Sequence, residues 1–401
     1  MPAAPTRCGH FTYQMTAKKR YLVEGAKLVL PDRVVDGWLR IDSSRISSIG
    51  FEQPSLESED EVLDAGDLTI YPGFIDVHIH GADGIDTMEA SAEELSRASV
   101  WLAAQGVTGW MPTLVPGPVE EYQRAVAAIE EAHSISEGAR VLGVHYEGPF
   151  VNAAQCGALR SQFFRTYAVV DNIDDLPVLR RFSGKHLMTV APEVTGGIEL
   201  IAELTRRGWI VSIGHTRADF DVLDQARSVG ARHMTHFMNA MAPLHHRSPG
   251  PVGWGLLNDV VTCDVIADGI HLDPRTLQIL MKIKGAQRLV LISDAIAAAG
   301  LGDGVYHIWN ESITVKGGRT SNQHGSIAGS VISMLDAVRL MSSLGVAEVD
   351  LARISSTNPA RLLEIENECG SIEEGKRADL VALDDAGQVR FTMIGGEVVY
   401  S

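Results

Sequence analysis

The chain has few cysteines and no closely spaced pair of them. Its four cysteines in 401 residues are Cys8, Cys156, Cys263 and Cys369, so no Cys-x-x-Cys motif occurs. Closely spaced cysteines would be expected of a disulfide-rich secreted scaffold or of a cysteine-ligated zinc site. We therefore expect a reducing, cytoplasmic setting.

Long apolar runs are also missing. No stretch reaches the roughly 18 apolar residues that a transmembrane helix needs, so we expect no membrane association. Residues 1–20 contain Arg7, Lys18, Lys19 and Arg20 but no apolar core of signal-peptide length. We interpret residues 1–20 as a flexible N-terminal extension, with an organelle-targeting segment as the alternative.

Positive charge is scarce. The chain has 34 Lys and Arg against 51 Asp and Glu, which gives a net charge of −17. Nucleic acids and anionic membranes are bound by basic surfaces, so we expect neither as a partner. An anionic small molecule would need local positive charge from a metal ion, Arg or His.

From residue 70 onward, β-like and helix-like segments alternate regularly. A capping-box pattern at Ser91 and Glu94, for example, opens a helix that runs to about Gln105. Eight strand–helix repeats predict a (β/α)8 barrel. An open doubly wound sheet is the alternative, but no G-x-G-x-x-G turn follows the first strand. The eight β-like segments contain FIDVHI, VTGWMPTLV, VLGVHYEG, LMTVAPEV, WIVSIGHT, HMTHFMN, VTCDVIADG and RLVLISDA.

Short β-like runs separated by turn residues occur at both ends of the chain. They lie between Tyr21 and about Asp67 and again from Ala378 to Tyr400. We expect the two ends to pair into one small β-sandwich domain. The predicted division is an extension at 1–20, a β-sandwich from 21–70 and 358–401, and a barrel at 71–357.

Imidazole and carboxylate side chains follow the predicted barrel strands. His78 and His80 end the first strand, and residues two apart on a strand point to the same face, so both can bind one zinc-like ion. Capping or exposed histidines are the alternative. Barrel enzymes carry their reactive groups at these strand ends, so the pattern predicts a site for Zn²⁺ or another divalent first-row ion. Further candidates at later strand ends are Glu147, Glu193, His215, His236, Asp268 and Asp294.

The order of motifs resembles a known family. PGFIDVHIHG, HYEGPF, SIGHT, THFMNAM and SDA occur in the order found in the amidohydrolase superfamily. Within it the sequence is similar to the N-acetylglucosamine-6-phosphate deacetylases from Tyr21 to Val399. Most other amidohydrolases have a carboxylated lysine where this chain has Glu147.

The resemblance implies a metal-dependent amide hydrolase. Glu147, His215 and His236 would bind the principal ion, and His78 and His80 a second, with Glu147 bridging. One or two ions per subunit are expected, Zn²⁺ first, with Fe²⁺, Mn²⁺ or Co²⁺ as alternatives. Asp294 would act as general base toward metal-bound water and then as general acid toward the leaving amine. N-acetylglucosamine-6-phosphate would give glucosamine-6-phosphate and acetate.

The resemblance also implies a substrate-binding set and a homodimer. Arg247 would bind the sugar phosphate, in its own or a neighbouring subunit, and residues 327–329 would close over the sugar. A surface role for Arg247 and a packing role for Ile327 are the alternatives. The expected substrate-binding residues are Gly157, Ala158, Asn239, Ala240, Arg247, His271, Ile327, Ala328 and Gly329.

One position departs from the family pattern. Leu159 stands where the family has a histidine that helps to polarise the carbonyl, and leucine cannot donate a hydrogen bond. Either the retained pair His78 and His80 compensates, or the substrate is a related N-acetyl sugar or another amide. Arg160 could supply a new anion contact. A non-catalytic scaffold is a further alternative, but such a protein would be expected to lose metal ligands.

Overall fold

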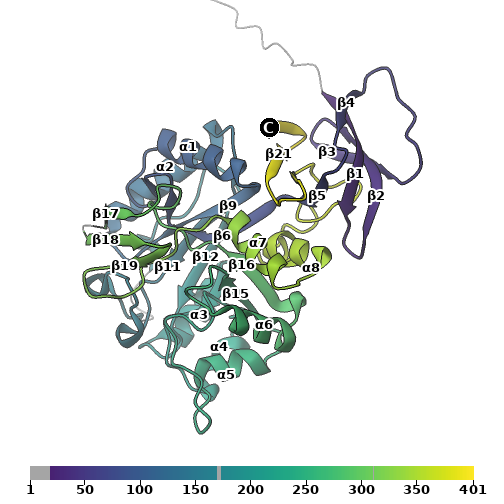
Figure 1. The fold of residues 1–401 in the computed structure, drawn as a ribbon. Coiled ribbons are helices and arrows are strands. Elements are labelled where there is room, and N and C mark those ends of the chain that lie inside the picture. Colours follow the sequence, from purple (N-terminus) through teal and green to yellow (C-terminus); the bar gives the residue numbers. More distant parts are fainter. Residues whose placement is uncertain (1–18, 169–172, 310) are drawn as a thin grey trace, which may run out of the picture.

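A computed structural model describes residues 19–168, 173–309 and 311–401. The predicted extension lies outside these residues except for its last two. The centre of the fold is an eight-stranded parallel barrel, as the sequence predicted (Figure 1). Each strand pairs with its neighbour in chain order, and the short β10 (Arg140–Val141) also pairs with the second strand. The barrel strands are β6 (Phe74–Ile79), β9 (Val107–Leu114), β11 (Gly143–Glu147), β12 (Lys185–Val190), β13 (Ile210–Ile213), β14 (His233–Met234), β15 (Thr262–Ile266) and β16 (Leu289–Ile292).

The barrel is closed between its first and last strands by a few specific bonds. The backbone N–H of Asp294 donates to the carbonyl of His78 at 2.9 Å. The Asp76 carboxylate, which is fully buried, accepts from Ser293 Oγ at 2.5 Å and from the Ser293 N–H at 3.3 Å. One backbone hydrogen bond and two hydrogen bonds to the buried Asp76 side chain therefore join the first and last strands, whose described residues form no regular ladder with each other.

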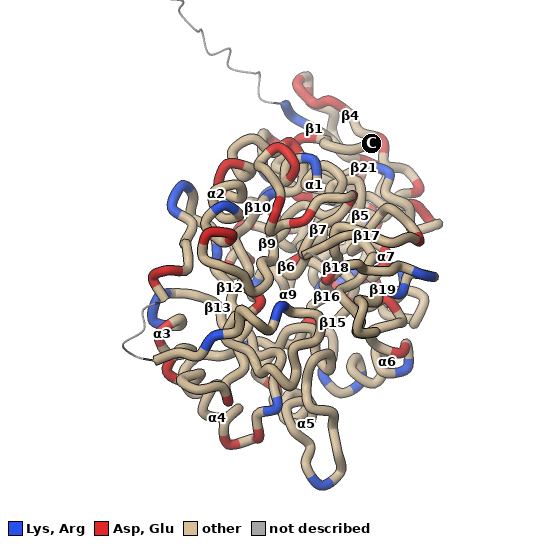
Figure 2. The backbone as a smooth tube through the Cα atoms, turned by 90° about the vertical axis from the view of Figure 1, so that its left-hand side faces the viewer, with Lys and Arg blue, Asp and Glu red and all other residues tan. Residues whose placement is uncertain are grey.

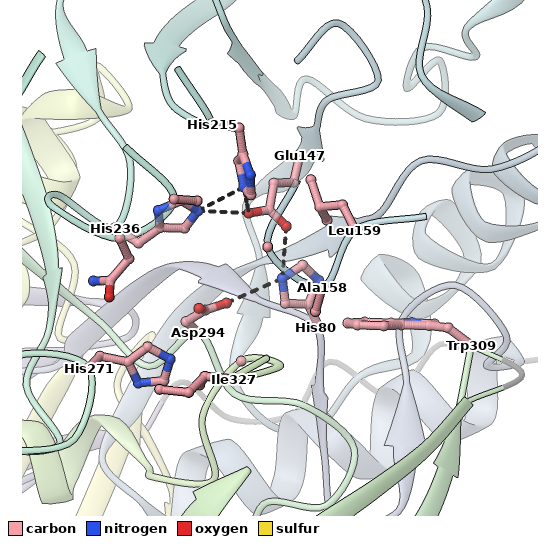
Figure 3. A pocket seen from close by; sticks show the side chains of 14 residues that line it. His80, Glu147, Ala158, Leu159, His215, His236, His271, Asp294, Trp309 and Ile327 are labelled. Carbon is pink, nitrogen blue, oxygen red and sulfur yellow. Dashed lines mark hydrogen bonds and ion pairs between the residues drawn. The ribbon is translucent and has the colours of Figure 1, made fainter. Parts of the chain in front are cut away.

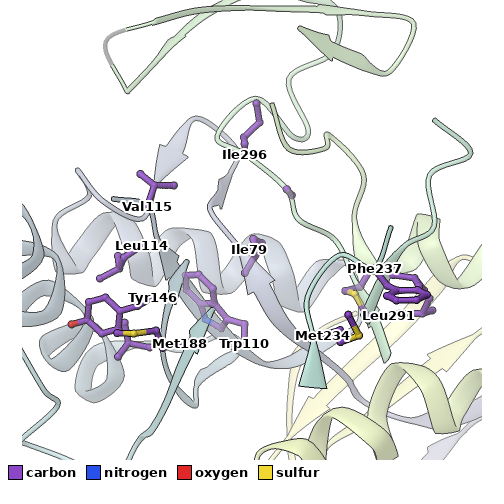
Figure 4. Close-up of a cluster of buried hydrophobic side chains, with 14 of the residues drawn as sticks. Ile79, Trp110, Leu114, Val115, Tyr146, Met188, Met234, Phe237, Leu291 and Ile296 are labelled. Atoms are coloured by element: carbon purple, nitrogen blue, oxygen red, sulfur yellow. The ribbon is translucent and has the colours of Figure 1, made fainter. Parts of the chain in front are cut away.

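Apolar residues fill the space between the barrel and its helices. Trp110 on β9 and Tyr146 on β11 point outward and are fully buried (Figure 4). Their polar atoms are paired, because Trp110 Nε1 donates to Ser99 Oγ at 3.1 Å and Tyr146 OH donates to the Pro177 carbonyl at 2.6 Å. Since successive side chains of a strand face opposite ways, an outward Tyr146 leaves Glu147 pointing to the inside of the barrel.

Helices cover the outside of the barrel. The predicted capping box is confirmed, because Ser91 Oγ accepts from the Glu94 N–H at 3.3 Å and the Glu94 carboxylate accepts from the Ser91 N–H at 2.9 Å. Between β11 and β12 the described residues form 3-10 turns, η1 (Ala153–Gln155), η2 (Ser161–Phe163) and η3 (Ile173–Asp175), in place of an α-helix. The helices are α1 (Ala92–Ala104), α2 (Val119–Ile135), α3 (Gly197–Arg206), α4 (Phe220–Ser228), α5 (Gly250–Leu257), α6 (Pro274–Ile283), α7 (Met334–Ser343), α8 (Glu348–Ala352), the π-helical turn η5 (Arg353–Thr357) and α9 (Asn358–Leu362).

The two ends of the chain form one mixed sheet beside the barrel, as expected (Figure 1). The strand order is β22-β21-β20-β5-β1-β2-β3, and β4 pairs with β1. Because β5 continues almost directly into β6, this sheet leads into the strand that carries His78 and His80. Its strands are β1 (Arg20–Val29), β2 (Val34–Asp42), β3 (Arg45–Gly50), β4 (Glu61–Asp64), β5 (Thr69–Pro72), β20 (Leu380–Leu383), β21 (Val389–Ile394) and β22 (Glu397–Tyr400).

Two small sheets lie on the connections of the barrel. The pair β7 (Gly81–Ala82) and β8 (Ile85–Asp86) follows β6, and the antiparallel strands β17 (Gly304–Ile308), β18 (Glu311–Lys316) and β19 (Arg319–Ser321) follow β16. Acidic segments lie on many elements around the molecule, with basic segments between them (Figure 2). None of the helices in the described ranges is both long and apolar enough to cross a membrane.

Candidate metal centre

Six side chains that the sequence singled out meet at one end of the barrel. Figure 3 shows five of them, all but His78. His78 lies in β6, His80 directly follows that strand, and Glu147 is the last residue of β11. The other three follow the ends of their strands: His215 after β13, His236 after β14 and Asp294 after β16. All six residues are buried. The barrel therefore gathers residues that are more than 200 positions apart in the sequence.

Glu147, His215 and His236 form the first set of potential ligands. Glu147 Oε1 lies 2.9 Å from both His215 Nε2 and His236 Nε2, and the two nitrogens are 3.1 Å apart. A tetrahedral zinc ion with bonds of about 2.0–2.1 Å spaces its ligand atoms roughly 3.3 Å apart. The observed spacing is close to that value, so these residues fit a small divalent cation.

His78, His80 and Glu147 form the second set. The two Nε2 atoms are 3.2 Å apart, and His80 Nε2 is 3.3 Å from Glu147 Oε2. Each set has all of its ligand atoms within 4.8 Å of one another. Glu147 Oε1 is also 3.6 Å from His78 Nε2, so the Glu147 carboxylate lies between the two sets, as a bridging carboxylate must.

Hydrogen bonds behind the ligands orient the imidazole rings. His215 Nδ1 lies 2.7 Å from the Gln155 carbonyl, which can only accept, so Nδ1 carries the proton and Nε2 keeps its lone pair for a metal ion. His78 Nδ1 lies 3.0 Å from Thr235 Oγ1. These bonds fix the rings before an ion binds.

Carboxylates hold the backbone beside two of the ligands. Asp264 accepts from the His236 N–H and from His233 Nε2, the latter at 2.9 Å. Glu193 accepts from Thr216 Oγ1 at 2.6 Å, directly after His215. Such support is needed because His215, His236 and Asp294 have positive φ angles of 48°, 27° and 48°. Left-handed backbone is unfavourable for residues other than glycine and often occurs at functional sites.

The charges of the centre depend on one another. Burial opposes the charged form of His80, but hydrogen bonds to Asp294 and Glu147 outweigh it and raise the pKa of His80 to about 10. Burial likewise opposes the charged form of His236, yet the Glu147 carboxylate raises the pKa of His236 to about 9. For Glu147 burial is again outweighed, and the surrounding imidazoles hold its pKa well below the usual range. In the metal-free protein the imidazole rings of His80 and His236 are therefore protonated, and a metal ion must displace those protons to bind.

Most of the expected substrate-binding residues line the same cavity. It has a volume of about 150 Å³, and His80, Glu147, His215, His236 and Asp294 form part of its wall. His271 faces it with its Nδ1 held 2.6 Å from Asp268 Oδ2, which leaves Nε2 for a ligand. The other predicted residues in the wall are Gly157, Ala158, Asn239, Ala240, Ile327 and Gly329.

Gly329 must be a glycine for two reasons. Its φ is +58°, and an added Cβ would lie 2.7 Å from Ile296 Cγ2 and 2.8 Å from the Asp294 carbonyl oxygen. The neighbouring Ala328 is fully buried behind the wall, so of residues 327–329 it alone is absent from the cavity lining.

Arg247 does not line the cavity of its own chain. It lies in the exposed turn before α5, where its NH1 is 2.7 Å from His246 Nε2. A contact between Arg247 and substrate therefore remains a prediction for a neighbouring subunit.

Trp309 lines the cavity but was not expected there. Its indole lies edge-on to the His80 ring, with centroids 5.4 Å apart and planes at 82° (Figure 3). Trp309 follows β17, which belongs to a small three-stranded sheet. The sequence of that sheet does not predict that it lies over the barrel.

Leu159 also lines the cavity, beside Glu147 (Figure 3). The neighbouring Arg160 is paired elsewhere, because its NH2 donates to Glu121 Oε2 at 2.8 Å and its Nε donates to the Pro116 carbonyl at 2.8 Å. Arg160 therefore does not supply the additional anion contact considered from the sequence, and the wall at Leu159 is apolar.

Comparisons with known proteins agree with this geometry. The model of the amidohydrolase family matches residues 69–399. The chain is 34% identical to the N-acetylglucosamine-6-phosphate deacetylase of Bacillus subtilis (strain 168) over 390 residues, which covers 94% of this chain and 97% of that protein. It is 33% identical to the N-acetylgalactosamine-6-phosphate deacetylase of Escherichia coli O157:H7 over 370 residues, covering 90% and 96%.

A solved structure shows the same fold with a substrate in place. A variant of the Mycobacterium smegmatis N-acetyl-D-glucosamine-6-phosphate deacetylase, in complex with N-acetyl-D-glucosamine-6-phosphate, matches with a TM-score of 0.85 and 30% identity. The match covers 96% of this chain and all of that one.

Proposed function

The chain belongs to the N-acetylglucosamine-6-phosphate deacetylase family of amidohydrolases, and we propose that it hydrolyses the N-acetyl amide of N-acetylglucosamine-6-phosphate. The products are glucosamine-6-phosphate and acetate. The observation that carries this proposal is the meeting of two His and Glu ligand sets, joined by Glu147, with Asp294 in one cavity.

The two ligand sets fit divalent cations, with Glu147, His215 and His236 holding one ion and His78, His80 and Glu147 the other. A divalent ion in such a site supplies Lewis acidity, which polarises an amide carbonyl and makes water more acidic. Zinc is the proposed ion, because imidazole and carboxylate are its usual ligands, and Fe²⁺, Mn²⁺ or Co²⁺ suit the same donors.

Asp294 moves the proton. Its Oδ1 lies 3.3 Å from His80 Nε2 and 3.4 Å from His78 Nε2, so it faces the space between the ligands. Although burial opposes the charge, the two imidazoles lower the pKa of Asp294. The group is therefore a carboxylate at neutral pH and can take a proton from the attacking water. A C–O bond forms, the C–N bond breaks, and Asp294 returns the proton to the leaving nitrogen.

The cavity has two unlike sides that orient the substrate. His236 and His271 lie on one side in Figure 3, and Leu159 and Trp309 lie on the other. The sugar belongs on the polar side, where His271 Nε2 is free to contact a hydroxyl, and the acetyl group points to the apolar side.

We further propose a cytoplasmic homodimer in which Arg247 binds the phosphate in the neighbouring cavity. Arg247 and Leu244 are both exposed on the turn before α5. A guanidinium group suits a phosphate because it can donate two parallel hydrogen bonds. Cys263 and Cys369 are buried and unpaired, which suits a reducing compartment.

The second candidate substrate is N-acetylgalactosamine-6-phosphate. The 33% identity to the Escherichia coli O157:H7 enzyme of that name favours it, as does Leu159 at a position where the related deacetylases are expected to have histidine. Both candidates require the same metal centre and the same amide chemistry.

The test is acetate release from the two phosphorylated epimers and from unphosphorylated N-acetylglucosamine, with metal content measured on the same sample. We expect turnover of N-acetylglucosamine-6-phosphate to exceed that of the other two by at least about tenfold. Faster turnover of the galactose form would replace the proposed substrate. Metal-loaded protein that releases no acetate from any of them would overturn the deacetylase proposal.

A further inference from the structure

A second polar cavity lies at the opposite end of the barrel from the metal centre. We call it the basal cavity; it is lined by Arg232, Thr262, Gln287, Arg288, Asn358 and Arg361 among others, and its volume is about 170 Å³. Arg232 precedes β14, Thr262 begins β15 and Arg288 precedes β16. These are the amino-terminal ends of strands whose carboxyl ends lead to His236 and Asp294. The basal cavity is therefore separate from the catalytic pocket.

Three guanidinium groups converge on the basal cavity. Arg232 NH2 donates to Glu364 Oε1 at 2.6 Å. For the side chains of Arg288 and Arg361, no hydrogen bond or ion pair to another described residue is recorded. Two of the three cations are thus left without a carboxylate partner in a protein whose net charge is −17.

A fourth cation lies close by. Lys284 Nζ is buried and donates to the carbonyls of Gly255, Asn258 and Val261 at 2.6–2.9 Å. Burial lowers the pKa of Lys284 and the charge of Arg288 lowers it further, against the opposing effects of Cys263 and Asp259. The cations of this region (Arg232, Lys284, Arg288 and Arg361) therefore outnumber the two carboxylates placed near them, Glu364 and Asp259.

Asn358 fixes the inner wall of the basal cavity. The residue is 3% exposed, and its Nδ2 donates to the carbonyls of Ala286 and Leu289 at 2.7 Å each. Its Oδ1 is buried and has no hydrogen-bond partner among the described residues. An unpaired buried acceptor costs about 1–3 kcal/mol. The atom is closed off from the cavity, so the contribution of Asn358 to the site is to hold the backbone on both sides of Arg288 in place.

We propose that the basal cavity binds a phosphate group, as inorganic phosphate or as the phosphate of a sugar phosphate. Guanidinium forks match pairs of phosphate oxygens, which gives Arg288 and Arg361 the partners they lack. The acidic remainder of the surface offers an anion few competing positions.

Equilibrium dialysis of the metal-loaded protein against radiolabelled orthophosphate at constant ionic strength tests the proposal. The double variant R288Q/R361Q is compared with R124Q, which removes an exposed arginine of α2. We expect R124Q to bind like the unchanged protein. We expect R288Q/R361Q to lose one bound phosphate per chain, or to bind it at least about tenfold more weakly. Equal isotherms for the two variants would overturn the proposal.

Further variants separate binding from folding. Arg361 is exposed, so R361Q alone should fold and should still weaken binding. R288K/R361K keeps both positive charges but loses the paired N–H donors of the guanidinium groups. It should therefore bind phosphate with an intermediate affinity. If R361Q binds phosphate as tightly as R124Q does, Arg361 has no part in the site and the proposal fails.

Competition identifies the source of the phosphate. Unlabelled glucosamine-6-phosphate or unlabelled inorganic phosphate is added to R124Q that carries the labelled phosphate. If glucosamine-6-phosphate displaces the label at a concentration about tenfold lower than inorganic phosphate does, the cavity is assigned to a phosphate ester. Equal displacement would assign it to inorganic phosphate. The same competition experiment on R288Q/R361Q measures the phosphate that binds in the catalytic pocket, and this amount is subtracted from the result for R124Q.

Discussion

Ser293 Oγ donates a 2.5 Å hydrogen bond to Asp76 Oδ2, and both residues are almost completely buried. The bond joins the residue directly after β16, the last strand of the barrel, to β6, the first. Two residues after Asp76 comes His78, and one residue after Ser293 comes Asp294. The contact that closes the barrel therefore also sets the distance between a potential metal ligand and the proposed base.

Asp76→Ala should destabilise the protein by about 3 kcal/mol, because it leaves three buried donors without their acceptor: Ser293 Oγ and the backbone N–H groups of Ser293 and His78. Ser293→Ala removes one donor and should cost only about 1 kcal/mol. Urea unfolding of both variants measures the difference. A cost for Ser293→Ala equal to that for Asp76→Ala would contradict the closing role of the carboxylate.

Metal affinity should fall as the pH falls. The pKa values of about 10 for His80 and about 9 for His236 mean that both rings hold protons at neutral pH in the metal-free protein. For each proton that a metal ion must displace, the affinity for the ion falls by about tenfold for every unit that the pH lies below the pKa of that ring. Competition with a chelator of known affinity at pH 6.5, 7.5 and 8.5 measures this. Affinity that stays constant across that range would show that the rings are already neutral.

Metal binding should also release protons. Titration calorimetry in two buffers with different ionisation enthalpies gives the number released at pH 7.5, and we expect about two when both ligand sets fill. His80→Asn should reduce that number by about one.

Asp294→Asn should abolish most of the activity without removing the metal. An amide cannot accept the proton from water, and loss of a general base lowers turnover by about 10²–10⁴-fold. Metal content and kcat are measured on the same sample, beside Asp385→Asn, which changes an exposed aspartate far along the chain. Retention of more than about a tenth of the activity would assign the base elsewhere.

Leu159→His tests why the chain can lack the family histidine. If His78 and His80 compensate, Leu159→His alone should change kcat by less than about threefold. His80→Asn alone should lower kcat by about 10²-fold, and the added imidazole should recover about tenfold of that loss. Leu159→Met serves as the apolar control. A large gain from Leu159→His in the unchanged protein would show that compensation is incomplete.

Asp268→Asn should weaken substrate binding more than turnover. Asp268 accepts from His271 Nδ1 at 2.6 Å and from the Ile270 and His271 N–H groups at 2.8 Å each. The amide loses the charge that orients the ring, so KM should rise about tenfold while kcat changes less. Steady-state kinetics checks this, and a loss confined to kcat would instead place His271 in the chemical step.

The residues of the metal centre could be predicted because each one ends a strand with a clear pattern. His78 and His80 share a face through the period of a strand, and the eight strands have apolar sequences long enough to recognise. Glu147, His215, His236 and Asp294 then follow from the rule that barrel strands end at one rim. The structure brings all six together.

Other features have no local signal in the sequence. Trp309 reaches the cavity through a small sheet that is not part of the barrel repeat. Asp76 looks like any polar residue in a strand, and its role depends on Ser293, 217 positions away. The segment between β11 and β12 contains turns where the repeat predicts a helix. These features depend on long-range packing, which local propensity does not determine.

The sheet made from both ends of the chain has a consequence for biosynthesis. β5 pairs with β1 on one side and with β20 on the other, from Thr69 opposite Leu383 to Pro72 opposite Leu380. While the chain is being made, β5 therefore keeps an open edge until the ribosome has added some 300 further residues. An unpaired edge can pair with other chains, and contacts between distant segments form slowly. The β5 edge, which leads into the strand that carries His78, is consequently covered only when β20 has been made, and a chain that stops before β20 would expose that edge permanently.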